Sequence, residues 1–284
     1  MQRSVFCQKV REAQRYIAQG DIYQANLSHS LSFGVRKNAE DIYEELRRIN
    51  PSPFFGLLDA GRFQILSGSP ERLIRLEGRR LDTRPIAGTR PRKKGTSDEA
   101  VTLELVLNEK ERAEHLMLLD LERNDLGRVA EYGSVTVDEL MTVEDYSHVK
   151  HIVSNVRATL REGLDAVDVL KAFFPGGTIT GAPKIRCMQI IDELEAAPRG
   201  PYTGSLGYIS FTGNMDFNII IRSLVLRRGR ACLNVGAGIV ADSDADREFD
   251  ETLYKAEAVL RAVFGKNGAR RFLGSCGTRS RMSG

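Results

Sequence analysis

Hydrophobic positions near the start of the chain repeat with the period of a helix. Phe6, Val10, Ala13 and Ile17 follow one another at spacings of four, three and four residues. These spacings place all four side chains on one face of an α-helix. Gly20 stands where a glycine in a left-handed conformation commonly ends a helix. The pattern predicts an opening helix that ends just before Gly20.

From Ile22 onward the period changes to two, which is the period of a β-strand. One face of the expected strand is largely apolar and carries Tyr23, Ala25, Leu27, Leu31 and Phe33. The other face is polar and carries Gln24, Asn26, Ser28, Ser30 and Ser32. We therefore expect a strand that covers a core with one face only.

The rest of the chain divides into helical and β-rich stretches that glycine and proline separate. Further helices are expected at about residues 42–49, 98–125, 164–174, after Pro183, and at 246–264. Strands are expected as short pieces in 54–83, at 134–143 and 149–160, and as three runs within 203–242. Residues 85–97 are expected to form a basic loop. Dipeptides suited to hairpins, Gly213-Asn214 and Arg228-Gly229, predict antiparallel pairing.

Together these elements predict the α+β class, built on antiparallel sheet. No linker or internal repeat divides the chain, so we expect a single domain over residues 1–265. The stretch 266–284 is basic and rich in small residues, and we expect a disordered tail there.

Composition narrows the class of protein without identifying it. A chain of 284 residues with 42% hydrophobic side chains can bury a large core. Its net charge is only +3, and its most basic stretch, 75–94, has no aromatic side chain on which a base could stack, so we expect no nucleic-acid partner. The four cysteines form no Cys-x-x-Cys pair, which suits a reducing compartment. No apolar run reaches membrane-spanning length and the chain opens on a charged amphipathic segment, so we expect a cytoplasmic protein with no membrane association.

The last expected helix carries two stripes of different character. Phe249 belongs to an apolar stripe, whereas Glu248, Glu251 and Lys255 share a second face well away from it. Such a face is ordinarily solvent-exposed and held by ion pairs between residues three or four apart. A scaffold or metal-binding domain without catalysis would also show this pattern.

The long expected helix has a matching pair of carboxylates. Glu111 and Glu114 stand just before the apolar run 116–121, where an unpaired charge would be costly. Arg112 is one possible partner. A hard cation such as Mg²⁺, which prefers oxygen ligands, is another. Spacing alone leaves the choice between a metal site and ion pairs open.

Several candidate residues lie on turns or interrupt strands. The loop 176–181 exposes backbone N–H groups just before a helix and suits an anion. Gly236 and Gly238 lie inside an apolar strand, where glycine is unfavourable unless a ligand or the backbone must approach closely. Arg222 interrupts the apolar run 217–226, so we expect a central-strand arginine that meets an anion. Taken alone, His151 and Glu71 predict no more than ordinary strand residues.

Some of these segments occur together in the order found in one enzyme family. They are 85–90 (Pro-Ile-Ala-Gly-Thr-Arg), 113–117 leading to Arg123-Asn124-Asp125, the loop 174–184, Gly236-Ala237-Gly238, and 251–255. From about residue 5 to 264 the chain resembles the chorismate-binding enzymes, which include anthranilate, aminodeoxychorismate, isochorismate and salicylate synthases. The resemblance implies a large antiparallel β-sheet sandwich flanked by helices. Relatives of this type carry a further N-terminal region that contributes to the same sandwich.

The resemblance also implies a role for each candidate. Mg²⁺ would be ligated directly by Glu114 and Glu251 and supported through waters by Glu111 and Glu248. The carboxylates of chorismate would also meet a set of groups on the side away from the metal: Tyr202, Arg222, Lys255 and the backbone of Gly236 and Gly238. Thr178 and His151 would line the ring. Glu71 matches the general acid that protonates the departing C4 hydroxyl.

The residue type at the position of Gln24 distinguishes the members of this family that use water from those that use ammonia. Members that add water have a lysine at the matching position, whereas glutamine is typical of members that use ammonia from a glutamine amidotransferase subunit. An amide cannot act as a general base near neutral pH, so isochorismate and salicylate chemistry is disfavoured. Ala87 lies where one subgroup of aminodeoxychorismate synthases has a covalent lysine, so that route is closed. Anthranilate synthases have alanine there, and so do other aminodeoxychorismate synthases, so Ala87 does not decide the product.

The remaining choice is between the two aminating reactions. The loop 174–181 and the segment 207–218 are more similar to aminodeoxychorismate synthases than to anthranilate synthases. We therefore expect Mg²⁺-dependent amination of chorismate to 4-amino-4-deoxychorismate, on the route to para-aminobenzoate and folate, with anthranilate synthesis as the alternative.

Overall fold

The structure of the protein is a computed structural model that describes residues 2–91, 102, 109–145 and 149–278. Contacts within the chain separate two compact units. The first unit comprises Met1–Ser69, Ile179–Gly204 and Ile220–Gly284, and the second comprises Pro70–Thr178 and Ser205–Ile219. Each unit contains its own antiparallel sheet, which confirms the expected α+β class.

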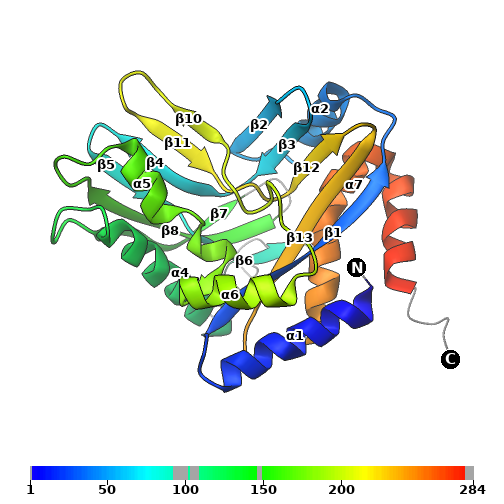
Figure 1. Cartoon of the computed structure of the whole chain (residues 1–284), viewed down its shortest axis with the longest axis horizontal. Helices are drawn as coiled ribbons and strands as arrows, with labels where there is room; N and C mark the ends of the chain where they lie inside the picture. The colour runs from blue at the N-terminus through cyan, green and yellow to red at the C-terminus, as the bar shows by residue number, and fades with distance from the viewer. Residues whose placement is uncertain (1, 92–101, 103–108, 146–148, 279–284) are drawn as a thin grey trace. The chain divides into compact units, whose positions relative to one another are not determined.

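The first unit is built on a six-stranded sheet in the order β2-β3-β12-β13-β1-β9. Its strands are β1 (Gln24–Gly34), β2 (Phe54–Asp59), β3 (Gln64–Ser69), β9 (Gly181–Ala182), β12 (Ser223–Arg227) and β13 (Arg230–Ile239). The long strands β1 and β13 lie side by side (Figure 1) and pair antiparallel from Ala25↔Ile239 to Gly34↔Arg230. The tight turn between β12 and β13 uses positive φ angles of 50° at Arg228 and 72° at Gly229, as the expected hairpin requires.

Four helices belong to the first unit. They are α1 (Arg3–Ala18), α2 (Ala39–Ile49), α6 (Lys184–Leu194) and α7 (Ala245–Thr278). The apolar face of β1 is buried as predicted: Leu31 and Phe33 pack with α2 and α7, while Ala25 and Leu27 pack with α1, α6 and Phe249 of α7. On the polar face Ser30 and Ser32 are exposed. The alternation of apolar and polar positions is therefore confirmed, but the polar face is exposed only in the second half of β1, because Gln24 and Ser28 are buried.

The second unit is built on a seven-stranded sheet in the order β10-β11-β4-β5-β8-β6, with β7 paired to β8. Its strands are β4 (Arg72–Glu77), β5 (Arg80–Thr83), β6 (Ile86–Pro91), β7 (Thr136–Asp145), β8 (Val149–Thr159), β10 (Gly207–Ile209) and β11 (Met215–Asn218). The helices are α4 (Glu109–Gly127) and α5 (Ala166–Phe173), and a 3₁₀ turn follows at Gly177–Ile179. His115 of α4 is fully buried and its Nε2 lies 2.6 Å from Ser154 Oγ of β8, so this helix is anchored on the sheet.

Three elements differ from the predictions. Residues 86–91 form strand β6 instead of a loop, because they pair with β8. The apolar run 217–226 is divided between β11 and β12, which belong to different sheets, and Arg222 lies in the break with a φ of 50°. Arg222 is therefore not a central-strand arginine. Residues 92–101 and 103–108 lie outside the described residues, so the start expected for the long helix is not tested.

The C-terminal segment also differs from the expected disordered tail. The helix α7 breaks at Gly265, where φ is 70°, and then continues to Thr278. Beyond the break Ala269 is 1% exposed, and the ring of Phe272 lies 5.3 Å from that of Phe33. An apolar core contact thus holds this segment as helix, while 279–284 lie outside the described residues. No helix in the described part of the chain is long and apolar enough to cross a membrane.

Candidate functional site

In β13, the backbone N–H and C=O groups of Gly236 and Gly238 point away from β1, toward the side where pairing with β12 has ended. The N–H of Asn26 donates to Thr180 O at 2.9 Å and that of Ser28 to Glu195 Oε1 at 2.7 Å, so both point away from β13. Their partners across the ladder, Gly238 and Gly236, must then also direct their N–H and C=O groups away from β1. On that side the described pairing of β12 stops at Leu224↔Leu233. The backbone N–H groups of both glycines are therefore available to a ligand.

The two glycines also leave room above β13 for amide side chains of β1. A Cβ on Gly238 would lie 2.3 Å from Gln24 Nε2. A Cβ on Gly236 would lie 2.8 Å from Asn26 Oδ1 and 2.8 Å from the backbone oxygen of Leu27. Each amide thus leans diagonally across the ladder and lies over a glycine. Close approach of neighbouring side chains and backbone therefore explains both glycines, and their contact with a ligand stays a prediction.

Tyr202 lies against the same glycine and is fixed by a buried ion pair. Its hydroxyl oxygen would be 2.9 Å from a Cβ on Gly236, and burial raises the pKa of its phenol. Nearby, Arg199 donates to both carboxylate oxygens of Glu195 at 2.9 and 2.7 Å. The guanidinium also donates to the backbone oxygen of Asn26 at 2.6 Å and of Ile179 at 2.9 Å. Arg199 therefore ties the polar face of β1 to the segment that carries Tyr202.

The carboxylates of α7 lie beside this strand edge. Lys255 Nζ donates to Gly236 O at 3.1 Å and lies 2.7 Å from Glu251 Oε1. The Glu251 side chain is 51% exposed, so its carboxylate is open to solvent. One turn earlier, Glu248 Oε1 accepts the hydroxyl of Ser243 at 2.7 Å. The predicted acidic face of α7 thus joins Gln24, Tyr202 and both glycines in one half-site of the first unit.

In the second unit, three further predicted residues have side chains that the structure describes. Glu71 is 7% exposed just before β4, and its backbone oxygen accepts the N–H of Ile219 at 3.0 Å. Glu114 lies on α4, and the Gly177 backbone packs on the same helix, because a Cβ there would lie 3.3 Å from Leu121 Cβ. Thr178 Oγ1 is buried and makes no hydrogen bond to another described residue. Each of these groups is described within the second unit, and their common role in one site stays a prediction.

Four predicted residues stand apart from these contacts. Ala87 lies on β6, Glu111 on α4 and His151 on β8, but their side chains lie outside the described residues. Arg222 is half-buried, and its backbone oxygen accepts the N–H of Gly68 at 3.3 Å. Their expected roles toward a substrate stay predictions.

The chemistry of the acidic face fits a hard cation. Glu248 and Glu251 present carboxylate oxygens, which are the ligands that Mg²⁺ prefers, and one of these side chains is solvent-accessible. Within the described ranges no three His, Cys, Asp or Glu side chains gather around one point. A cation held by one or two protein carboxylates, with waters completing its shell, is the arrangement that Mg²⁺ commonly adopts.

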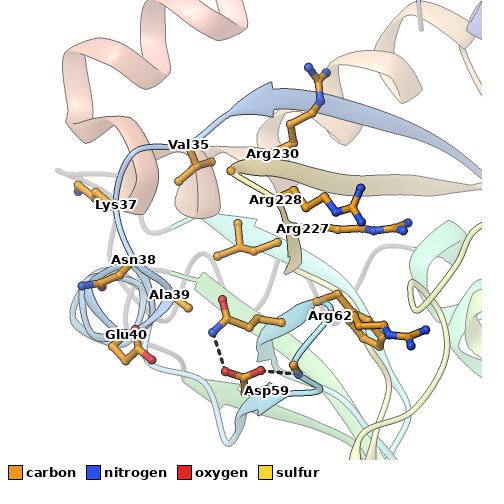
Figure 2. A pocket seen from close by; sticks show the side chains of 15 residues that line it. Val35, Lys37, Asn38, Ala39, Glu40, Asp59, Arg62, Arg227, Arg228 and Arg230 are labelled. Carbon is orange, nitrogen blue, oxygen red and sulfur yellow. Dashed lines mark hydrogen bonds between the residues drawn. The ribbon is translucent and has the colours of Figure 1, made fainter.

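A separate pocket of about 290 Å³ lies at the other end of β13 (Figure 2). Its basic side chains are Lys37, Arg62, Arg227, Arg228 and Arg230. Asp59 lies among them and accepts from Gly61 N and Gln64 Nε2, bonds that lower the pKa of its carboxyl. Gly236 lies six residues beyond Arg230, which is about 20 Å along a strand. The pocket contains none of the predicted site residues and is distinct from the half-site on β13.

Asn26, Glu195 and Arg199 belong to the half-site but were not among the candidates from sequence. Asn26 was placed on the polar face of its strand, two residues from Gln24, and that position was the available signal. Glu195 and Arg199 are four residues apart after α6 and have no pattern that distinguishes them from surface charges. Their burial, with side chains 7% and 14% exposed, is a tertiary property.

Comparison with known proteins gives one family and two kinds of relative. Residues 1–261 match the family described as chorismate binding enzyme. The chain is 53% identical over 259 residues to aminodeoxychorismate synthase component 1 of Bacillus subtilis, covering 91% of this chain and 55% of that protein. It is 54% identical over 256 residues to anthranilate synthase component 1 of Aquifex aeolicus, covering 89% of this chain and 52% of that protein. The chain therefore spans about half the length of these curated relatives.

A solved structure gives the same result for the fold. Anthranilate synthase component I from Streptococcus pneumoniae aligns with a TM-score of 0.85 at 43% identity, over 91% of this chain and 58% of that one.

Proposed function

The chain belongs to the chorismate binding enzyme family, and from this premise we propose that it replaces the C4 hydroxyl of chorismate with an amino group from ammonia. In this reaction a C–N bond forms, the C4–O bond breaks, and the hydroxyl leaves as water after it takes up a proton. The product is 4-amino-4-deoxychorismate. The reaction adds no group other than the amine and needs no oxidant.

The observation that carries this proposal is the buried amide of Gln24. It is 8% exposed and lies over Gly238 in the half-site, where an amide can hydrogen-bond to a nucleophile but cannot deprotonate water. Ammonia is itself a nucleophile and needs no such base. Relatives at 53% and 54% identity carry the names of two aminating enzymes, which supports amination over hydration.

The other candidate residues of the two units take the following parts in the proposal. Tyr202, Lys255 and the backbone N–H groups of Gly236 and Gly238 bind substrate carboxylates, since each offers a donor or a positive charge. Arg222 contributes a further cationic contact. Glu71, as a buried carboxyl group, donates the proton to the leaving hydroxyl. Ala87, Thr178 and His151 line the ring.

Magnesium is part of the proposed reaction. Glu114 and Glu251 would hold the ion directly, and Glu111 and Glu248 would hold its waters. When bound, the ion would offset the negative charge of the substrate carboxylates beside these glutamates. The ammonia would come from a glutamine amidotransferase subunit, a partner that the designation "component 1" of the relatives supports.

Product identification tests the proposal. The protein is incubated with chorismate, Mg²⁺ and ammonium, and the product is identified by mass spectrometry and by its retention on a chromatographic column. We expect 4-amino-4-deoxychorismate, formed without a partner when ammonium is supplied and only with the amidotransferase when glutamine is supplied. Isochorismate as the product would overturn amination. Anthranilate with pyruvate would establish the second candidate, which the similar identity to anthranilate synthase component 1 favours.

A further inference from the structure

Two amide oxygens on one face of β1 are buried without a hydrogen-bonding partner. They are Gln24 Oε1 and Asn26 Oδ1, and neither accepts a hydrogen bond from any residue that the structure describes. A buried acceptor left unsatisfied costs about 1–3 kcal/mol, so two on neighbouring positions need an explanation. The missing element is a donor, because each oxygen is an acceptor only.

The positions of the two amides make a shared ligand geometrically reasonable. Residues two apart on a strand point to the same side and lie about 7 Å apart at their Cα atoms. Both side chains lean over a glycine of β13, Gln24 over Gly238 and Asn26 over Gly236. Two N–H bonds from one nitrogen, each about 2.9 Å to its acceptor, need acceptors about 5 Å apart. Side chains rooted 7 Å apart on a flat face can meet that spacing.

We infer that Gln24 and Asn26 together form the binding site for the ammonia nucleophile, with one amide oxygen accepting from each of two N–H bonds. This inference rests on the proposed amination and identifies how its second substrate is held. Asn26 is the new member of the site.

The chemistry of ammonia explains why neutral acceptors suit it. When two of its N–H bonds point to amide oxygens, its lone pair stays free to form the C–N bond. The nitrogen becomes positively charged as this bond forms, and it returns to neutrality by releasing a proton to solvent. Neither amide can take up that proton near neutral pH, so the pair positions ammonia and does not act as a base. A protonated lysine at position 24 would present only donors and would repel an ammonium ion.

The test separates ammonia binding from other roles of Asn26. Asn26→Ala, Asn26→Asp and a control, Ser30→Ala, are compared in the full chain with ammonium as nitrogen source. Ser30 is exposed on the same face of β1 and lies outside the half-site. The KM for ammonium, the KM for chorismate and kcat are measured for each, together with the unfolding temperature.

Removing one neutral hydrogen bond should raise the KM for ammonium by roughly tenfold in Asn26→Ala. The KM for chorismate and kcat at saturating ammonium should stay near wild type. Asn26→Asp keeps an oxygen in the same place and should recover most of the loss, and Ser30→Ala should match wild type. An unchanged KM for ammonium in a folded Asn26→Ala, or an equal rise in both KM values, would overturn the inference and leave amination intact. Absence of any ammonium-dependent chorismate consumption by the wild type would overturn the proposed function and this inference together.

Discussion

Substitution of Gly238 by alanine separates the role of Gln24 from the stability of the sheet. The added Cβ would lie 2.3 Å from Gln24 Nε2, and this is the single contact that it makes at less than 3.0 Å. A non-bonded pair needs about 3.5 Å, so the amide must move by about 1 Å. The obstacle is the far end of a side chain, which can rotate. The structure therefore predicts a displaced amide in an intact sheet.

The expected energies follow from the same contact. Moving Gln24 off its preferred rotamer costs about 0.5–1.5 kcal/mol, whereas replacing a strand glycine with alanine gains about 0.5–1 kcal/mol. The free energy of unfolding should thus change by less than about 1 kcal/mol. A displacement of about 1 Å at a positioned reacting group can lower the rate by about a hundredfold. Activity should therefore fall strongly in a protein of nearly unchanged stability.

Gly236→Ala is the matched comparison. Its Cβ would lie 2.8 Å from the backbone oxygen of Leu27, which cannot rotate away, so the strand itself must shift. We expect a loss of about 1–3 kcal/mol in unfolding free energy for this variant. Urea unfolding and ammonium-dependent consumption of chorismate are measured for both. Full activity of Gly238→Ala, or equal destabilisation of the two variants, would refute the reasoning.

Three further outcomes are expected. Glu251→Gln should abolish Mg²⁺-dependent chorismate consumption. It should change the free energy of unfolding by less than about 1 kcal/mol, because the 2.7 Å ion pair with Lys255 is half-exposed. Retained activity in a Mg²⁺ titration would contradict the metal assignment. Arg199→Lys should lower the free energy of unfolding, measured with urea, by about 2–3 kcal/mol. One ammonium group cannot replace the hydrogen bonds of Arg199 to Glu195 and to two backbone oxygens. An unchanged urea midpoint would argue against this network. Burial lowers the pKa of His29 to about 4, so its contribution to stability is complete above about pH 6.5 and is lost as the pH falls toward 4, by roughly 3 kcal/mol. Unfolding at about pH 7 and about pH 5 should show about 2 kcal/mol of this loss, and equal stability at both would show that His29 is not buried in its neutral form.

Much of the local structure follows from the sequence because its causes are local. The period of two after Ile22 predicts β1 and its polar face, and the stripe that includes Phe249 predicts the buried side of α7. Within the stretch 54–83, where short strands were predicted, glycines with positive φ, Gly61 at 71° and Gly78 at 60°, lie between successive strands. Hydrophobic period and turn chemistry act within a few residues, so a single sequence displays them.

The tertiary structure decided which segments share a sheet and which polar groups share a site. Arg222 interrupts the apolar run 217–226, but the sequence does not show that the two halves belong to different sheets. Both halves are equally apolar, and the division arises from pairing with β4 and β3. The helix beyond Gly265 likewise depends on a contact between Phe272 and Phe33, far away in sequence. Local composition cannot display such contacts.

The half-site on β13 combines both kinds of information. The sequence by itself showed that Gly236 and Gly238 are unusual for an apolar strand, and the order of its motifs indicated the family. Gln24 and the acidic face of α7 became candidates through that resemblance. Only the tertiary structure placed the amide of Asn26 over Gly236, because that position depends on the register between β1 and β13. A shift of one residue in that register would turn the amide to the other face. The local pattern selected the residues, and long-range pairing decided which of them meet.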